Sequence, residues 1–240
     1  MIKIEKVDVW GFEHAIRGMR NPLNSWERSD SALCKGAEGF EDCTVNVHGV
    51  CPRRDDFRED VFCIGQSDHE LMTKLSKGGS PHRKFFRQIM VSLDITAPLY
   101  WWKEFDTYKI GTTANSCSTM HKIHSKPFTL DDFSCEQLDA VSIKILKMVI
   151  EELNFNIDCF ANYENIKDEL PNTERKQFWW NIIQLLPTSY NQKRTVTLNY
   201  ENLLNILEYR RGHKLDEWNI FCDWIMSLPY AELLEAGVKK

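Results

Sequence analysis

Small polar side chains are concentrated between Thr112 and Ser118, where the sequence reads Thr-Thr-Ala-Asn-Ser-Cys-Ser. The apolar run that precedes them, residues 97–105, is typical of a buried helix. Buried hydroxyl, amide and thiol groups each need a hydrogen-bond partner, and few protein cores supply so many in sequence. A ligand rich in donors and acceptors can satisfy them. This segment is therefore the first candidate for a binding site.

Two kinds of chemistry are available in this segment. Asn115 offers a donor and an acceptor to the edge of a base, and the neighbouring hydroxyls can reach phosphate or ring oxygens. Cys117 is a candidate nucleophile if a cation such as His121 or Lys122 stabilises its thiolate. The alternative is that Cys117 is a small buried hydrophobe. His121 and His124 suit acid–base work, although exposed loop histidines are common.

A second cluster alternates basic and aromatic residues from Ser80 to Arg87, in the order Ser-Pro-His-Arg-Lys-Phe-Phe-Arg. Arg83 and Arg87 provide forked donors and Lys84 a point charge, a combination that suits phosphate. The alternative is a solvated loop whose two phenylalanines pack inward. The sequence leaves both interpretations open.

A third cluster follows a helix start predicted at Asn199. Asn202 and Asn205 are three residues apart and share a face, while leucine and isoleucine form the apolar side. Arg210 and further basic residues come at the helix end, where positive charge complements the helix dipole. Buried asparagines need hydrogen-bond partners, so this helix is a further candidate for ligand contact.

The composition limits the class of protein. The 240 residues are 42% hydrophobic and 12% aromatic, which is enough for a packed core. A net charge of −5 argues against general nucleic-acid binding, because a surface that follows phosphates needs excess lysine and arginine. The opening residues do not form a signal sequence, and no apolar run approaches the length of a membrane span. We expect a cytoplasmic protein with reduced cysteines and without nucleic-acid or membrane partners.

The eight cysteines include no Cys-x-x-Cys pair. Cys43, His48, Cys51 and Cys63 are the candidate ligands of a zinc site, but their spacing matches no strong ligand pattern. Ordinary loop cysteines are the favoured interpretation, and no metal is expected.

Periodicity predicts the elements that position these clusters. Alternating apolar residues predict strands at 2–9 and 88–96, and a β-branched run predicts a third at 194–198. Capping boxes at Ser67–Glu70 and Ser134–Gln137 predict the starts of two helices. Further helices are predicted at 11–20, from Pro98 onward, and at 173–186, 199–211 and 215–228.

Residues 21–61 are irregular, so they form either a functional loop region or short strands that the pattern does not place. No internal repeat, low-complexity tract or linker divides the chain. The sequence therefore predicts an α+β fold in one mixed α/β domain, residues 1–240, with a helical C-terminal half.

The stretch from Ile89 to Ser118 resembles the core of the flavin-dependent thymidylate synthases. In that family a strand ending in Ala-Pro leads into a helix, and an Arg-His-Arg motif with later serines and a final arginine follows. Aligned without gaps from Ala97-Pro98, this chain has Thr-Tyr-Lys at residues 107–109, so the motif arginines are reduced to a lysine. An arginine-to-lysine or arginine-to-threonine change at a bidentate site is not conservative.

The C-terminal half extends the resemblance. Residues 197–210 resemble the family's Asn…Asn…Leu-Arg helix, which places Asn199 and Asn205 on flavin-contacting asparagines. Arg210 then falls on an arginine that contacts the nucleotide. Ser80-Pro81 resembles the Thr/Ser-Pro that precedes the family's flavin-contacting stretch. The resemblance covers roughly two thirds of the chain and is weak at residues 21–65 and 124–175.

The resemblance implies a set of site residues. Cys117 falls on the family's nucleotide-activating serine, and a shift of one residue brings Ser116 or Ser118 there instead. The residues implied to contact a flavin are Ser80, Arg83, Arg87, Tyr108, Lys109, Asn199 and Asn205. The residues implied to contact the substrate are Lys103, Glu104, Asn115, Thr119 and Arg210.

The resemblance also implies FAD as cofactor, a pyrimidine nucleotide as ligand, and a homotetramer whose sites form between subunits. The activity it implies is reductive alkylation at C5 of a deoxyuridylate-type substrate, with the flavin carrying reducing equivalents. Loss of the motif arginines leaves a second class open: a protein without catalysis that sequesters or senses a nucleotide, for instance in a phage. A flavin enzyme acting on another substrate is a third.

Overall fold

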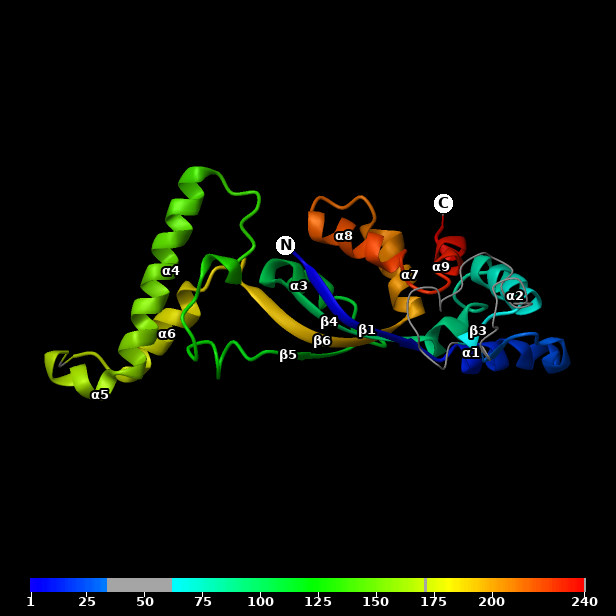
Figure 1. The fold of residues 1–240 in the computed structure, drawn as a ribbon, viewed down its shortest axis with the longest axis horizontal. Coiled ribbons are helices and arrows are strands. Elements are labelled where there is room, and N and C mark those ends of the chain that lie inside the picture. The colour runs from blue at the N-terminus through cyan, green and yellow to red at the C-terminus, as the bar shows by residue number, and fades with distance from the viewer. Residues whose placement is uncertain (34–61, 171, 240) are drawn as a thin grey trace, which may run out of the picture. The chain divides into compact units, whose positions relative to one another are not determined.

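The computed structural model describes residues 1–33, 62–170 and 172–239 (Figure 1). These residues form two compact units. Unit 1 consists of the described residues within 1–5, 94–107 and 114–195, and unit 2 consists of the described residues within 6–93, 108–113 and 196–240. Organisation as a single domain therefore stays a prediction.

Helices and short strands alternate along the chain, and the C-terminal half is mainly helical, as the sequence predicts. The strands are β1 (Lys3–Trp10), β2 (Ala32–Leu33), β3 (Phe62–Cys63), β4 (Met90–Pro98), β5 (Thr113–Ser116) and β6 (Asn191–Asn199). The helices are α1 (Phe12–Arg20), α2 (Gln66–Lys77), α3 (Leu99–Phe105), α4 (Ala140–Ala161), α5 (Tyr163–Ile166), α6 (Arg175–Leu185), α7 (Tyr200–Arg210), α8 (Asp216–Ile225) and α9 (Glu232–Gly237). The described part of the chain contains a four-stranded sheet of order β1-β4-β6-β5 and an antiparallel β2–β3 pair (Figure 1).

The strand predicted at residues 88–96 is confirmed, with bounds shifted to Met90–Pro98. Its alternating apolar residues are buried, because period-two alternation puts every second side chain on one face. In unit 2, Tyr200 N donates to Ile89 O at 3.0 Å, and Thr197 Oγ1 donates to Ser92 Oγ at 3.3 Å. The partner numbers rise on one strand as they fall on the other, so β4 and β6 run antiparallel.

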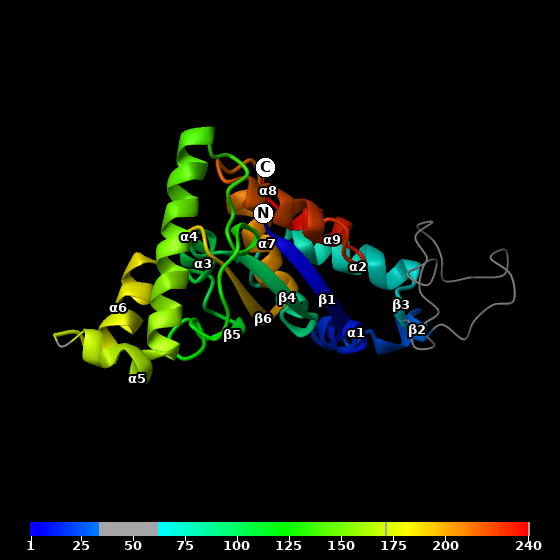
Figure 2. The ribbon, with the colours of Figure 1, turned by 60° about the vertical axis from the view of Figure 1, so that its left-hand side comes forward.

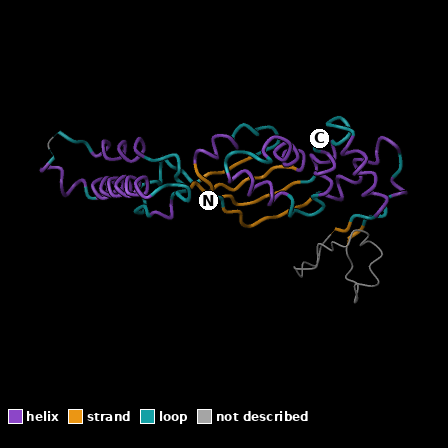
Figure 3. The backbone as a smooth tube through the Cα atoms, turned by 90° about the horizontal axis from the view of Figure 1, so that it is seen from above, coloured by secondary structure: helices purple, strands orange, loops and turns teal. Residues whose placement is uncertain are grey.

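In unit 1, α4 and α6 lie side by side (Figure 3). Residues of α4 spaced three and four apart turn one face of this helix inward, and Ile182 of α6 meets that face. Phenylalanines from the preceding loop complete the cluster. Its buried members are Ile123, Phe128, Phe133, Leu146, Ile150, Leu153, Ile157 and Ile182.

In unit 2, α7 packs against α8 and α9, and α9 packs against α2 (Figure 2). Tyr200, the first residue of α7, is completely buried, and its hydroxyl donates to Pro229 O at 2.6 Å. The ring of Phe12 meets the ring of Tyr200 edge-on at 5.7 Å between centroids. The start of α7 is therefore fixed in the core of unit 2, which gives the candidate site described below a rigid base.

The predicted capping box at Ser67–Glu70 is wrong. Helix α2 begins at Gln66, so its N-cap is Gly65 instead of Ser67, and no side chain of its own first turn caps it. The carboxylate of Asp30 caps it instead, because it accepts the backbone N–H groups of Ser67 at 2.9 Å and Asp68 at 3.1 Å. A cap supplied by a distant loop leaves no local pattern in the sequence.

The predicted capping box at Ser134–Gln137 is also wrong. Helix α4 begins at Ala140, and Asp139 caps it by accepting Ser142 N at 2.7 Å. Ser134 Oγ instead donates to Asn191 Oδ1 at 2.8 Å.

Two other expectations concern a metal site and membrane-spanning helices. Cys43, His48 and Cys51 of the candidate zinc site lie outside them, and inside them no group of three or more His, Cys, Asp or Glu side chains is placed to hold a metal. No described helix combines the length and apolarity that crossing a membrane requires. The sequence did not predict β5, α5 or α9, which are short.

Candidate functional site

The loop of residues 108–113 lies against the first turn of α7, and both belong to unit 2. Asn199 caps α7, as the sequence predicts: its Oδ1 accepts Asn202 N at 3.1 Å, and Asn202 Oδ1 accepts Asn199 N at 3.2 Å. Asn202 Nδ2 donates to Ile110 O at 2.6 Å. One pair of asparagines thus provides hydrogen-bond acceptors for backbone N–H groups at the start of α7 and also holds the loop against this helix.

Gly111 makes this close approach possible. Its φ is +76°, a value that L side chains rarely adopt, and a Cβ there would lie 2.8 Å from Asn199 Nδ2 and 3.1 Å from Asn202 Oδ1. A side chain at residue 111 would therefore be strained and would push the loop away from α7.

We expect Gly111→Ala to lower the free energy of unfolding by about 1–3 kcal/mol, because the positive φ and the clash with Asn199 both oppose a methyl group. Gly212→Ala is the matched control, since Gly212 also has a positive φ of +72° but open space around its Cβ position. Urea unfolding measures both variants. Equal losses would show that the packing against the two asparagines contributes nothing.

Aromatic side chains hold Arg210 at the end of α7. Its Nε donates to the Tyr108 hydroxyl at 3.0 Å, and its Nη1 lies 3.3 Å from His213 Nε2. The guanidinium carbon lies 4.7 Å from the ring centroid of Trp218, which is completely buried, and 5.7 Å from that of Tyr108. An arginine stacked in this way loses little entropy when it binds an anion.

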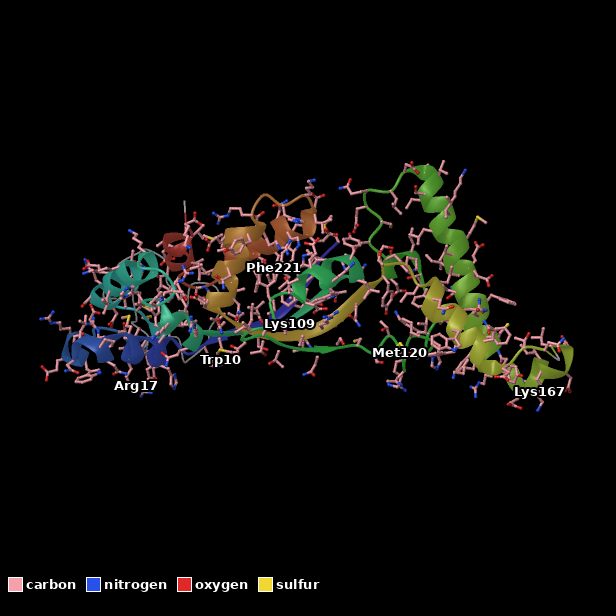
Figure 4. All side chains as sticks on the ribbon, turned by 180° about the vertical axis from the view of Figure 1, so that it is seen from behind. Trp10, Arg17, Lys109, Met120, Lys167 and Phe221 are labelled. Atoms are coloured by element: carbon pink, nitrogen blue, oxygen red, sulfur yellow. The ribbon has the colours of Figure 1, made fainter. Side chains whose placement is uncertain are left out.

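Three further polar side chains belong to the same loop and helix. Thr112 Oγ1 is buried and has no hydrogen-bond partner among the described residues, and such a group normally finds one. Asn205 is half-buried on α7, and Lys109 is exposed in the loop (Figure 4). The cluster of unit 2 thus presents a stacked cation, an amide and an unsatisfied hydroxyl, which suit an anionic ligand with polar ring atoms.

The basic cluster of residues 80–87 divides into a buried part and an exposed part. Arg83 is 5% exposed, and it donates to the Glu201 carboxylate at 3.2 Å and to Gly237 O at 3.0 Å. Phe85 and Phe86 are buried, as the solvated-loop alternative predicts. Arg87 is exposed, and its guanidinium donates to Ser80 Oγ at 3.0 Å. Arg83 is therefore engaged in fastening α7 to α9, whereas Arg87 remains at the surface.

The small polar run of residues 114–119 belongs to unit 1. Asn115 and Ser116 are exposed on β5, and Ser118 Oγ accepts His121 N at 3.0 Å in a turn. Cys117 is exposed, so the buried alternative for this cysteine is wrong. Its backbone N donates to Lys193 O at 2.9 Å, which fixes the main chain beside the thiol. Thr119 is half-buried.

Arg194 of β6 is a residue that the sequence analysis missed. Its guanidinium carbon lies 4.2 Å from the centroid of the Trp102 ring, and its Nη1 donates to Asp106 Oδ1 at 2.7 Å. Lys103 is exposed and Glu104 half-buried on α3 in the same unit. Its partners Trp102 and Asp106 lie some ninety residues earlier in the chain, so no local pattern around Arg194 indicates these contacts.

Sequence comparison and structural comparison give different results. No protein-family model matches the chain, and no curated protein matches its sequence. A crystal structure of thymidylate synthase X from Helicobacter pylori with FAD and dUMP matches with a TM-score of 0.61, 15% identity and 100% coverage of both chains. A second crystal structure of that flavin-dependent enzyme, also with FAD and dUMP, matches with a TM-score of 0.58 and 15% identity over 99% of this chain and 100% of the other.

The chain has the fold of the flavin-dependent thymidylate synthases. The match covers the whole length, so the predicted fold class is confirmed. The match also covers the described residues of the regions where the sequence resemblance is weak, namely 21–33, 62–65, 124–170 and 172–175. At 15% identity the thymidylate synthase fold is preserved while most side chains differ, which is why sequence comparison alone finds no relative.

Proposed function

We propose that this chain is a divergent, flavin-dependent thymidylate synthase-like protein that binds a pyrimidine nucleotide. The observation that carries the proposal is the arrangement around Arg210, because its guanidinium is stacked on Trp218 and oriented by Tyr108. A planar fork held in this way suits a nucleotide phosphate. The similar fold of a protein crystallised with FAD and dUMP supports the same ligand class.

The fit of a flavin is partial. Arg87, Lys109 and Asn205 are available to contact one, while Arg83 and Asn199 are engaged in the buried ion pair and the helix cap. When bound, a flavin would supply reducing equivalents for alkylation at pyrimidine C5. The protein's own contribution would be to bind the nucleotide at Arg210 and orient it.

A second candidate is a nucleotide-binding protein without catalysis on the same fold. The observation that favours it is the loss of cations from residues 107–109, where the only basic side chain is Lys109. Arg83, which the resemblance places at the flavin, is instead buried against Glu201. Such a protein would keep the contacts that orient Arg210 and would sequester or sense its ligand. In either case we propose a homo-oligomer located in the cytoplasm.

The absorbance spectrum of the purified protein, together with mass spectrometry of the small molecules that denaturation releases, distinguishes the two candidate functions. Bands of oxidised flavin, or uptake of added FAD with quenching of its fluorescence, would support the enzyme and justify turnover assays with dUMP. A colourless protein that takes up no FAD but binds dUMP in calorimetry would support the binder. Binding of neither ligand would contradict both.

If catalysis is retained, the Cys117 thiol is the proposed nucleophile or activating group, with Ser116 and Ser118 as its neighbours in the loop. We expect Cys117→Ala to reduce turnover by about 100-fold or more, because it removes the nucleophilic group, whereas Cys117→Ser supplies the hydroxyl that the resembled family has at this position. Cys135→Ala, at a half-buried cysteine of the same unit, is the control. Full activity in Cys117→Ala would assign the thiol no chemical role.

A further inference from the structure

A pocket of about 390 Å³ lies beside α1 in unit 2. Its lining residues come from α1, from the segment that follows this helix, and from β2 and β3. None of them belongs to α7 or to the loop 108–113, so the pocket is not part of the candidate site described above. Its volume is within the range of about 300–1,000 Å³ that is typical of sites for small molecules.

The buried polar groups of this pocket are already engaged within unit 2. Arg20 is 3% exposed, and it donates from Nε to Asp68 Oδ1 at 2.6 Å and from Nη2 to Ser67 Oγ at 2.9 Å. The hydroxyls of Ser29 and Ser31 both donate to Asp68 Oδ2. These groups hold the wall of the pocket in place, and the carboxylate of Asp68 neutralises the charge of Arg20. A ligand would therefore be recognised by other side chains of the lining.

Two charged side chains of the lining are available to a ligand. Glu13 and Arg17 are exposed and lie one turn apart on α1 (Figure 4). Neither side chain forms a hydrogen bond or an ion pair with any described residue. A glutamate four residues before a basic residue is the order that favours an ion pair within a helix, but this pair is not formed. The pocket therefore presents one negative and one positive group to its occupant.

Apolar side chains provide the remaining surface of the pocket. The indole of Trp26 is 50% exposed, and its Nε1 donates to Asn21 Oδ1 at 2.8 Å, which restrains the orientation of the ring. Leu33 is 55% exposed and Phe62 is half-buried, while Ile16 is buried. An exposed indole beside aliphatic groups suits an aromatic ring of a ligand, because aromatic pairs are attractive beyond the apolar area that they bury.

We propose that this pocket binds a zwitterionic amino acid with an aromatic side chain. Arg17 donates to the carboxylate of the ligand, Glu13 accepts from its ammonium group, and the ring packs against Trp26. A ligand with only a carboxylate would place it near Glu13, and a ligand with only an ammonium group would place it near Arg17. A zwitterion avoids both repulsions and complements both charges. The proposal does not depend on the binding of flavin or nucleotide.

Calorimetric titration of the full chain with L-phenylalanine at pH 7 tests the proposal, and we expect a dissociation constant below about 1 mM. Two analogues each lack one charge, since phenylpropionate has no ammonium group and phenethylamine has no carboxylate. Each should bind at least about tenfold more weakly, because it loses a charge-assisted hydrogen bond and keeps a charge near one of like sign. L-Alanine should also bind at least about tenfold more weakly, because it lacks the ring.

Two variants assign the charges of the ligand to the two side chains. Arg17→Gln should weaken the binding of L-phenylalanine at least about tenfold without weakening that of phenethylamine. Glu13→Gln should weaken the binding of L-phenylalanine to a similar extent without weakening that of phenylpropionate. Arg28→Gln is the matched control, because Arg28 is exposed and lies only two residues from Trp26 but does not line the pocket. It should leave every affinity unchanged.

Three results would overturn the proposal. The first is no binding of L-phenylalanine at concentrations up to about 10 mM. The second is equal affinity for L-phenylalanine and its two singly charged analogues, since the charges would then play no part. The third is an equal loss in Arg28→Gln and Arg17→Gln, which would assign the effect to net charge instead of the pocket. Urea unfolding confirms that each variant is folded, and the comparison of ligands in the wild-type protein needs no variant.

Discussion

Asp68→Ala is expected to lower the free energy of unfolding by about 3–5 kcal/mol, the largest loss that we expect from a single side chain outside the candidate site. Asp68 is completely buried, and its Oδ1 accepts Arg20 Nε at 2.6 Å. Its Oδ2 accepts the hydroxyls of Ser29 at 2.7 Å and Ser31 at 2.6 Å, and the backbone N–H of Asp30 at 3.1 Å. Alanine would leave the Arg20 guanidinium, 3% exposed, without its carboxylate.

Two variants sharpen this test. Asp68→Asn keeps the size of the side chain but not its charge, so a loss close to that of alanine would assign the effect to the charge itself. Glu70→Ala removes an exposed carboxylate from the same helix and should change stability by less than about 0.5 kcal/mol. Urea unfolding at pH 7 compares all three. A loss of less than about 1 kcal/mol for Asp68→Ala would mean that Arg20 finds other partners.

The Asp68 carboxylate is also expected to make the free energy of unfolding depend on pH. Burial raises its pKa, but hydrogen bonds from Ser31, Ser29 and Arg20 outweigh burial, and the folded-state pKa lies below the ordinary value. Its stabilising contribution is therefore complete above the unfolded-state pKa of about 3.9 and is lost as pH falls through the folded-state pKa.

The difference in stability between the wild-type protein and Asp68→Asn tests this prediction. It should be constant from about pH 7 to about pH 5 and shrink below about pH 4, because the unfolded chain then takes up a proton that the folded state resists. Urea unfolding at each pH measures it. A difference that stays constant down to pH 3 would assign the effect to hydrogen-bond geometry instead of charge.

The sequence predicted the elements whose signals are local. The alternation of apolar residues from Ile89 to Ile95 predicted β4. Asn199 predicted the start of α7, because the capping side chain and the backbone N–H that it accepts are only three residues apart. The starts of α2 and α4 were misplaced. In α2 the capping carboxylate, Asp30, lies more than thirty residues earlier, and in α4 the Ser134 hydroxyl is engaged with Asn191.

The candidate site shows the same limit. Arg210 and Arg83 look alike in the sequence, where each lies in a basic cluster. The fold separates them, because Arg83 is buried against Glu201 whereas Arg210 is half-buried and held by Tyr108 and Trp218. The partners of Arg83, Glu201 and Gly237, lie more than a hundred residues further along the chain, and no local pattern records them.

Arg210→Ala is expected to weaken nucleotide binding by more than about tenfold, since a hydrogen bond to a charged group contributes about 1.5–3 kcal/mol. Calorimetric titration with dUMP measures the effect. Tyr108→Phe should weaken binding by a smaller factor, because it removes only the hydroxyl that accepts Arg210 Nε and leaves the stacking on Trp218 in place.

Arg211→Ala is the matched control for Arg210→Ala, because it removes the same charge one residue further along the chain. Arg211 is exposed and forms a bidentate pair with Glu235 at 3.0 and 2.7 Å, and no residue of the loop 108–113 takes part in that pair. Equal affinities for wild-type protein and Arg211→Ala, with a loss in Arg210→Ala, would assign the phosphate contact to residue 210. Equal losses in both variants would mean that Arg210 acts only through the local positive charge at the end of α7. An unchanged affinity in a folded Arg210→Ala would remove it from the site.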